Sequence, residues 1–190
     1  MNGKPTYDCE ALWRVYLQHP DEKSLHALFN ASYKFLLSYG DKLTLDRNKT
    51  KDAIQEVFLN LWLYRGKISE DTKAVAYLLR SIRNEIARIE RKRKKNSRLT
   101  LDASAFLFYP HELQSNALDK NDKRVILKAL NSLPPRQREI LYFRFYRNIA
   151  YKEIAEILGI TYQSAVNQSY RAFCKLRTVE ALKKSSIYSL

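Results

Sequence analysis

Apolar residues recur at helical spacing along the first half of the chain, up to about Asn96. The clearest run steps by four and three residues through Val75, Leu79, Ile82, Ile86 and Ile89. This spacing is that of one face of an α-helix. The opposite side of the same helix would carry Arg80, Arg83, Asn84, Ala87 and Arg91. The pattern predicts a helix that packs inward on one side and points positive charge outward on the other.

A second helical segment, residues 48–66, has one apolar face and one mixed face. The face expected to be buried consists of Ile54, Val57, Phe58 and Leu61. The opposite face carries Asp52, Gln55, Glu56, Leu59 and Leu63. Leucines among carboxylates, on a side where solvent alone would favour uniform polarity, indicate a protein-binding surface. The alternative is two exposed leucines of no consequence, since single exposed apolar residues are normal.

The helical pattern is interrupted after Asn96. The stretch LTLDASAFLFYPHELQSNALD has no sustained period and holds turn formers around Pro110. A helical pattern resumes from about Asn121. Only 4 Gly and 5 Pro occur among the 190 residues, a composition that favours helices over all-β folds. We therefore expect an all-α protein of two small helical domains, residues 1–98 and 121–190, joined by a linker, residues 99–120. The apolar residues 105–109 would either dock a partner or pack between the domains.

The helical segment that begins after Gly159 separates small and apolar side chains from polar ones. On a helical wheel, one narrow face holds Ala165, Ser169, Ala172 and Leu176, with Phe173 at its edge. The opposite side holds Gln163, Asn167, Tyr170, Arg171 and Cys174. All of the latter except Cys174 can hydrogen-bond to base edges or phosphates. We expect one face to pack and the other to contact nucleic acid.

A short helix precedes this segment, with Ile154, Ala155, Ile157 and Leu158 as its apolar side. Gly159 suits the left-handed position after a helix, and Thr161 can cap the next helix. Ala155 and Gly159 are small where two helices are expected to cross closely. Upstream, Pro134 and Pro135 are expected to start another helix. The arrangement predicts a helix-turn-helix, with an ordinary helical hairpin as the alternative.

Charge points to a polyanionic partner. The chain has 34 Lys and Arg against 20 Asp and Glu, a formal net charge of +14. The run from Arg88 to Arg98 holds seven basic residues and one acid, a net +6 that is nearly half of this excess. Nucleic acid is the first candidate and an anionic membrane the second. A segment with this density of positive charge should bind along a phosphate backbone, and the binding should weaken as salt rises. The alternative is a merely solvated face, since solvated charge runs are common.

Other classes of chemistry find little support. Cys9 and Cys174 lie far apart, outside any CxxC or Cys/His pairing, so neither a metal site nor a disulfide framework is indicated. We find no catalytic constellation and expect no cofactor. The first residues lack a long apolar stretch, and nowhere do about 18 apolar residues run together. We therefore expect a cytoplasmic protein that is not an enzyme.

Two blocks of the chain together resemble the ECF (extracytoplasmic function) group of the sigma-70 family of bacterial transcription initiation factors. In the first block, roughly residues 25–96, DAIQEVFLNLW and AYLLRSIRNEIARIERKRKKN are similar to the family's region 2. In the second, residues 122–182, ALNSLPPRQREILYFRFYRNIAYKEIAEILGITYQSAVNQSYRAFCKLR is similar to region 4. Neither block alone is decisive, but both in this order and at this spacing are highly specific.

The resemblance implies a protein that binds core RNA polymerase and directs it to a promoter. Region 2 would recognise and help open the minus-10 element, and region 4 would read the minus-35 element in the major groove. The candidate DNA-binding residues are Arg80, Arg83, Asn84, Arg91, Lys92, Arg93, Lys94, Gln163, Ser164, Asn167, Tyr170, Arg171 and Lys175. The candidate polymerase-binding residues are Asp52, Gln55, Glu56, Leu59 and Leu63. An anti-sigma factor is a further partner that the resemblance implies.

Two other functions compete with this interpretation. A helix-turn-helix regulator could act without stable polymerase association, but it would not need the leucine and carboxylate surface. A recombinase of the resolvase sort would need an α/β catalytic domain with Gly-rich turns, whereas the first half here is expected to be helical.

Overall fold

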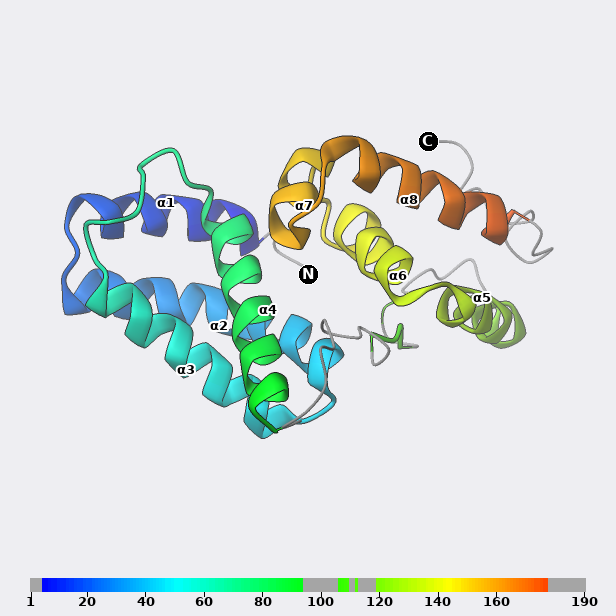
Figure 1. Cartoon of the computed structure of the whole chain (residues 1–190), viewed down its shortest axis with the longest axis horizontal. Coiled ribbons are helices and arrows are strands. Elements are labelled where there is room, and N and C mark those ends of the chain that lie inside the picture. Colours follow the sequence, from blue (N-terminus) through cyan, green and yellow to red (C-terminus); the bar gives the residue numbers. More distant parts are fainter. Residues whose placement is uncertain (1–4, 94–105, 110–111, 113–118, 178–190) are drawn as a thin grey trace. The chain divides into compact units, whose positions relative to one another are not determined.

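The computed structural model describes residues 5–93, 106–109, 112 and 119–177. The chain divides into two compact units, Met1–Leu101 and Asp102–Leu190. The first unit contains helices α1 (Pro5–Gln18), α2 (Glu22–Thr44), α3 (Arg47–Leu63) and α4 (Ala74–Arg93). The second contains α5 (Lys120–Ser132), α6 (Pro135–Leu141), the π-helix η3 (Tyr142–Tyr146), α7 (Tyr151–Leu158) and α8 (Tyr162–Leu176). The described residues form helices and no strand, which confirms the predicted all-α fold (Figure 1).

Short polar side chains set the helix boundaries in the first unit. Asp21 Oδ1 accepts a hydrogen bond from the Ser24 N–H at 2.7 Å, and Ser24 Oγ accepts from the Asp21 N–H at 3.2 Å. This capping box starts α2. Leu45, with φ of 55°, ends α2, and Asp46 Oδ1 caps α3 by accepting from the Asn48 N–H at 3.1 Å. α2 and α3 are thus joined by a short turn and pack against each other.

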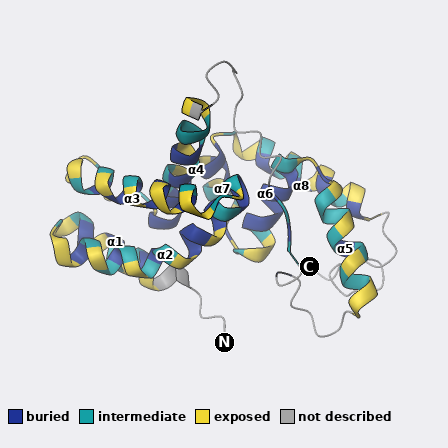
Figure 2. Ribbon diagram, turned by 90° about the horizontal axis from the view of Figure 1, so that it is seen from below, coloured by how far each residue is buried: buried dark blue, intermediate teal, exposed yellow. Residues whose placement is uncertain are grey.

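The apolar faces predicted from the sequence lie in the core of the first unit. Ile54, Val57, Phe58 and Leu61 of α3 are all buried, as are Val75, Leu79, Ile82 and Ile86 of α4. Ile89 is only half-buried, so the buried stripe of α4 ends about one turn earlier than predicted. It is also wider than the sequence pattern, because Leu78 and Glu85 are buried too. Figure 2 marks the buried residues of these helices in dark blue.

Gly40 allows α2, α3 and α4 to approach closely. A Cβ atom built on Gly40 would overlap Thr50 Cγ2 and would lie 3.3 Å from the Cδ1 atoms of both Ile82 and Ile86. Thr50 is fully buried, and its branched side chain has few alternative rotamers in a close-packed interior. The absence of a side chain at Gly40 therefore sets the spacing of the three helices.

We expect Gly40→Ala to lower the free energy of unfolding by about 1–2 kcal/mol, because overpacking outweighs the better helix propensity of alanine. Urea denaturation measures the effect. Ser38→Ala, at an exposed position of the same helix, is the matched control and should leave stability unchanged or slightly higher. A Gly40→Ala protein as stable as the wild type would mean that α2 can shift away from Thr50 without loss of packing.

In the second unit, α6 begins at Pro135 after an N-cap at Pro134, as predicted. It continues directly into η3, where the Arg147 N–H donates to the Tyr142 carbonyl at 3.0 Å, a span of five residues. Tyr142 and Phe143 are buried, whereas Phe145 and Tyr146 are exposed. The sequence pattern did not predict this π-helix.

Part of the segment predicted as a linker is packed into the second unit. The rings of Phe106 and Tyr142 meet edge to face at 5.4 Å. The Asn131 side chain brackets Phe108, accepting from its N–H at 2.8 Å and donating to its carbonyl at 3.1 Å. Phe106 and Phe108 are both buried, so this stretch contributes to the core of the second unit. Of the predicted linker before residue 119, the structure describes residues 106–109 and 112, and the other positions lie outside the described residues.

Candidate DNA and polymerase interfaces

The second unit contains the predicted helix-turn-helix. α7 ends at Gly159, whose φ of 63° lies in the left-handed region that favours glycine. Thr161 Oγ1 then caps α8 by accepting from the Ser164 N–H at 3.1 Å. A Cβ atom at position 159 would meet nothing within 4 Å. Position 159 therefore does not need a glycine to let two helices cross closely. The expectation of a close crossing at Gly159 is therefore wrong, and its backbone conformation explains the residue.

α8 has the two faces that its sequence predicts. The buried residues are Ala165, Ser169, Ala172 and Leu176. Those exposed on the other side are Gln163, Asn167, Tyr170, Arg171, Cys174 and Lys175, while Ser164 is half-buried. Gln163 Nε2 donates to Asn167 Oδ1 at 2.9 Å, so these two amides are ordered relative to each other. The exposed face offers donors and acceptors of the kind that read base edges in a major groove.

A polar contact that the sequence did not reveal fixes α8 against α7. Ser169 is 1% exposed, and its hydroxyl is 2.8 Å from the Tyr151 hydroxyl at the start of α7. The Arg144 guanidinium lies over the Tyr151 ring at 5.3 Å, and the Tyr162 ring meets it edge-on at 6.5 Å. Tyr151 thus contacts residues of both η3 and α8 from its place at the start of α7. Its hydroxyl is also the hydrogen-bond partner of the buried Ser169 side chain.

We expect Tyr151→Phe and Ser169→Ala each to weaken binding of α8 to its DNA site by about 1 kcal/mol, the usual net value of such a hydrogen bond. Because the two hydroxyls act together, the double variant should lose little more than either single one. Fluorescence anisotropy with labelled duplex DNA measures the binding. Additive losses would show that the two side chains act independently.

The outward face of α4 exposes Arg80, Asn84, Arg91 and Lys92, with Arg83 half-buried beside them. The side chain of Arg93 and all of Lys94 lie outside the described residues. Arg91 Nε donates to the Ala87 carbonyl at 3.2 Å, which orders its side chain along the helix. These described residues form the positive face that the sequence predicts.

Arg88, at the start of the basic run, is engaged by acids. Arg88 Nε donates to Glu85 Oε2 at 2.8 Å, and its Nη2 lies 3.8 Å from Glu56 Oε1 on α3. Hydrogen bonding by Glu85 raises the pKa of Arg88 above its usual value. Arg88 is therefore a bridge between α3 and α4 and contributes less positive charge to solvent than its sequence position suggests.

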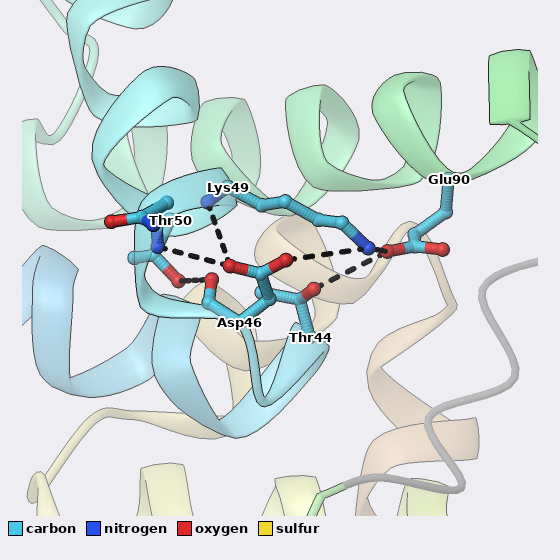
Figure 3. A network of polar contacts seen from close by, with 6 residues as sticks. Thr44, Asp46, Lys49, Thr50 and Glu90 are labelled. Atoms are coloured by element: carbon cyan, nitrogen blue, oxygen red, sulfur yellow. Dashed lines mark hydrogen bonds and ion pairs between the residues drawn. The ribbon is translucent and has the colours of Figure 1, made fainter.

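The single acid of the basic run is also held within the first unit (Figure 3). Glu90 Oε1 accepts from Lys49 Nζ at 2.5 Å and from Thr44 Oγ1 at 3.3 Å. Lys49 also lies 3.8 Å from Asp46, which caps α3. This network ties the start of α3 to the last turns of α4. Glu90 is thereby directed inward, and the charge that α4 presents outward is basic.

The mixed face of α3 lies where the sequence predicts. Leu59 and Leu63 are 50% and 60% exposed, respectively, and Asp52 and Gln55 are exposed beside them. Glu56 is half-buried because it faces Arg88. Two large apolar side chains one helical turn apart form a surface suited to a protein partner.

The two cysteines occupy different environments. Cys9 is fully buried, and burial raises the pKa of its thiol to about 12. Cys174 is exposed on α8. In the described part of the chain, no cluster of three or more His, Cys, Asp or Glu side chains could hold a metal ion. Nor does any helix found there have the length and apolar character needed to cross a membrane.

Comparison with known protein families assigns both units. The family model described as Sigma-70 region 2 matches residues 28–97, and that described as Sigma-70, region 4 matches residues 123–176. The chain belongs to the sigma-70 family. Members of this family bind core RNA polymerase and direct transcription initiation at promoters, so this sigma factor acts at that step. A regulator that never joins polymerase is not favoured, because the first unit matches region 2.

Relatives place the protein in the ECF group, as the sequence predicted. It is 27% identical over 150 residues to the ECF RNA polymerase sigma factor SigM of Bacillus subtilis, covering 79% of this chain and 88% of the relative. It is 24% identical over 154 residues to the RNA polymerase sigma factor SigZ of the same organism, covering 81% and 85%.

Two solved structures share the fold. The sigma factor RpoE in complex with the anti-sigma factor NepR from Bartonella quintana matches with a TM-score of 0.58 and 22% identity, over 86% of this chain and 99% of that one. CnrH in complex with the cytosolic domain of CnrY matches with a TM-score of 0.58 and 15% identity, over 94% and 100%. At these identities the likeness concerns the fold alone.

Proposed function

We propose that this sigma factor divides its work among three surfaces. The mixed face of α3 binds core RNA polymerase, the outward face of α4 engages and opens the minus-10 element, and the exposed face of α8 reads the minus-35 element. One observation carries the proposal: a single chain combines a helix-turn-helix with a separate helical unit that exposes Leu59 and Leu63 beside carboxylates. A DNA-binding protein that acts alone has no need of that second surface.

Polymerase binding is assigned to Asp52, Gln55, Glu56, Leu59 and Leu63. The two leucines supply apolar area, and the acids around them favour a basic partner surface. The family resemblance points to the clamp coiled coil of the largest polymerase subunit as that partner. Because Glu56 lies 3.8 Å from Arg88, part of its charge is already compensated within the sigma factor. Leu59 and Leu63 are therefore the expected anchors.

DNA binding is assigned to two separate sets of residues. Residues 1–98 would engage the minus-10 element through Arg80, Arg83, Asn84, Arg91, Lys92, Arg93 and Lys94. Residues 121–190 would read the minus-35 element through Gln163, Ser164, Asn167, Tyr170, Arg171 and Lys175. Residues 99–120 connect the two, and such a connection raises the effective concentration of the second contact once the first is made.

The remaining assignments follow from the role in initiation. RNA synthesis belongs to the polymerase, so we propose that the chain is not an enzyme and that it works in the cytoplasm with the transcription machinery. The similar RpoE and CnrH folds come from complexes with NepR and CnrY, respectively. We propose an anti-sigma factor for this chain as well, one that would hide the polymerase-binding face until a signal releases it.

Co-purification with core RNA polymerase, followed by run-off transcription on genomic DNA, tests the function. We expect a stable complex with core polymerase and discrete transcripts that core polymerase alone does not make. Sequence-specific DNA binding without co-purification would instead support the simple regulator. Relaxation or cleavage of supercoiled DNA by the purified protein alone would support a recombinase.

A further inference from the structure

Glu10 of α1 caps the N-terminus of α4, although the two are far apart in sequence. Its Oε2 accepts from the Ala74 N–H at 3.1 Å and its Oε1 from the Val75 N–H at 3.3 Å, residues 64 and 65 positions away. The first N–H groups of a helix have no partner within the helix. The residue before α4 is Lys73, whose side chain cannot accept a hydrogen bond. The carboxylate of Glu10 fills this role and also suits the positive end of the helix dipole.

Two more side chains on the same face of α1 hold the neighbouring chain. Trp13 Nε1 donates to the Thr72 carbonyl at 2.8 Å, and the Trp13 ring lies 5.1 Å from that of Tyr77. Tyr16 donates its hydroxyl to the Leu61 carbonyl near the end of α3 at 2.7 Å. Glu10, Trp13 and Tyr16 follow at intervals of three residues, so they share one face of the helix. α1 therefore braces both ends of the loop between α3 and α4.

The braced loop, residues 64–73, lies between the two surfaces of the first unit. It follows the α3 helix that exposes Leu59 and Leu63, and it leads into the positive face of α4. Its basic side chains Arg65, Lys67 and Lys73 are exposed. The Arg65 guanidinium lies 4.3 Å from the centre of the Trp62 ring, which orders it at the end of α3. A fixed loop would transmit the position of α3 on polymerase to the start of α4.

We propose that Glu10 is a positioning residue for promoter opening. By fixing where α4 begins, the carboxylate sets the rotation of the helix and hence the direction in which Arg80 and Asn84 point. Trp13 and Tyr16 hold the adjoining loop in register with it. Glu10 need not touch DNA or polymerase in this role. The inference rests on the proposed function, because it concerns the orientation of the α4 surface assigned to the minus-10 element.

Three full-length variants test the proposal. Glu10→Ala removes both acceptor oxygens, Glu10→Gln keeps one, and Asp8→Ala removes the same charge from an exposed position of the same helix. In the free protein, amide hydrogen exchange at Ala74 and Val75 should be about fivefold faster in Glu10→Ala, the size expected for a lost helix cap. Exchange in Asp8→Ala should stay within about twofold of the wild type, whereas Glu10→Gln, which keeps an acceptor for one of the two amides, should lie between the wild type and Glu10→Ala.

With core polymerase, strand opening is followed by 2-aminopurine fluorescence at the minus-10 position of a promoter recovered by run-off transcription. We expect Glu10→Ala to slow opening about fivefold, by the same loss of a helix cap. Affinity for polymerase and for the closed promoter should stay unchanged, and Glu10→Gln, with one acceptor oxygen, should restore part of the opening rate. Slower opening with unchanged affinities distinguishes a positioning role from a general loss of structure. A general loss of structure would also lower the affinity for polymerase and for the closed promoter.

Several outcomes would overturn the proposal. Unchanged exchange at Ala74 and Val75 in Glu10→Ala would show that the carboxylate does not hold α4. Equal impairment of Glu10→Ala and Glu10→Gln would show that the acceptor oxygen is not what matters. The positioning role would be removed if Glu10→Ala opened the promoter at the wild-type rate. It would also be removed if the opening rate fell by no more than the affinity for the closed promoter. Failure of the proposed function itself is distinct, because the wild-type protein would then support no opening with polymerase.

Discussion

Changing both Leu59 and Leu63 to lysine should abolish binding to core RNA polymerase while leaving the fold intact. Both side chains are at least half exposed, at 50% and 60%, so lysine at either position replaces solvent-facing apolar surface and creates no buried charge. Anchors at protein interfaces commonly contribute about 2 kcal/mol or more each. If the two contributions add, the affinity falls by about three orders of magnitude. Pull-down of core polymerase and titration by fluorescence anisotropy measure the loss.

Val15→Lys is the matched control for this double variant. Val15 is 48% exposed on α1, so the change makes the same kind of substitution on the same unit but on a different helix. It should bind polymerase as the wild type does. Urea denaturation should give the same stability for all three proteins. Wild-type affinity in the folded Leu59 and Leu63 double variant would remove this face from the polymerase interface.

Local sequence patterns predicted the helices and their faces well, for a physical reason. Side-chain direction along a helix follows from its 3.6-residue period alone. The buried set of α8 and the exposed set opposite it could therefore be inferred without knowledge of any neighbour. Caps are equally local, and Thr161 and Gly159 act at the ends of α8 and α7 as expected. The surfaces of the proposed sites can thus be located from the sequence.

Contacts between helices could not be predicted in the same way. Glu10 pairs with amides more than sixty residues away, and Lys49 pairs with Glu90 across 41 residues. Such pairings depend on how the helices cross, which the period of one helix does not determine. Local spacing did offer one signal that was missed: Glu85 stands three residues before Arg88, the spacing of an ion pair on one helix turn. In the net charge inferred from the sequence, Arg88 counts as unpaired positive charge. That count overestimates the positive charge that residues 88–98 present to solvent.

The buried polar residue Ser169 shows the same limit. On the wheel it falls on the packing face, where an apolar side chain is usual, and nothing nearby in sequence explains it. The Tyr151 hydroxyl 2.8 Å away supplies the explanation. Burying a hydroxyl without a partner is unfavourable, whereas a paired one also fixes the relative orientation of the two helices. The orientation of α8 relative to α7 therefore depends in part on side chains outside the exposed face of α8.

Replacing Asn167 or Arg171 with alanine should change which bases the minus-35 surface prefers. Both side chains are exposed on α8, and removal of a base-edge hydrogen bond commonly weakens recognition by about 1–3 kcal/mol. Because Gln163 donates to Asn167, the Asn167→Ala variant also frees the Gln163 amide and should shift the preference furthest. Selection from a randomised minus-35 library, with polymerase holoenzyme, measures the preference at each base.

Charge reversal of Arg91 and Lys92 should act differently, because these exposed residues of α4 are expected to follow the phosphate backbone. Affinity should fall for every promoter alike, and the base preferences at minus-35 should stay unchanged. The slope of log affinity against log salt should become shallower by about one for each phosphate that the variant no longer neutralises. The two classes of variant thus separate base reading from electrostatic anchoring in one experiment. If both gave the same base-preference profile, α8 would be no more selective than α4, and the assignment of base reading to Asn167 and Arg171 would have to be abandoned.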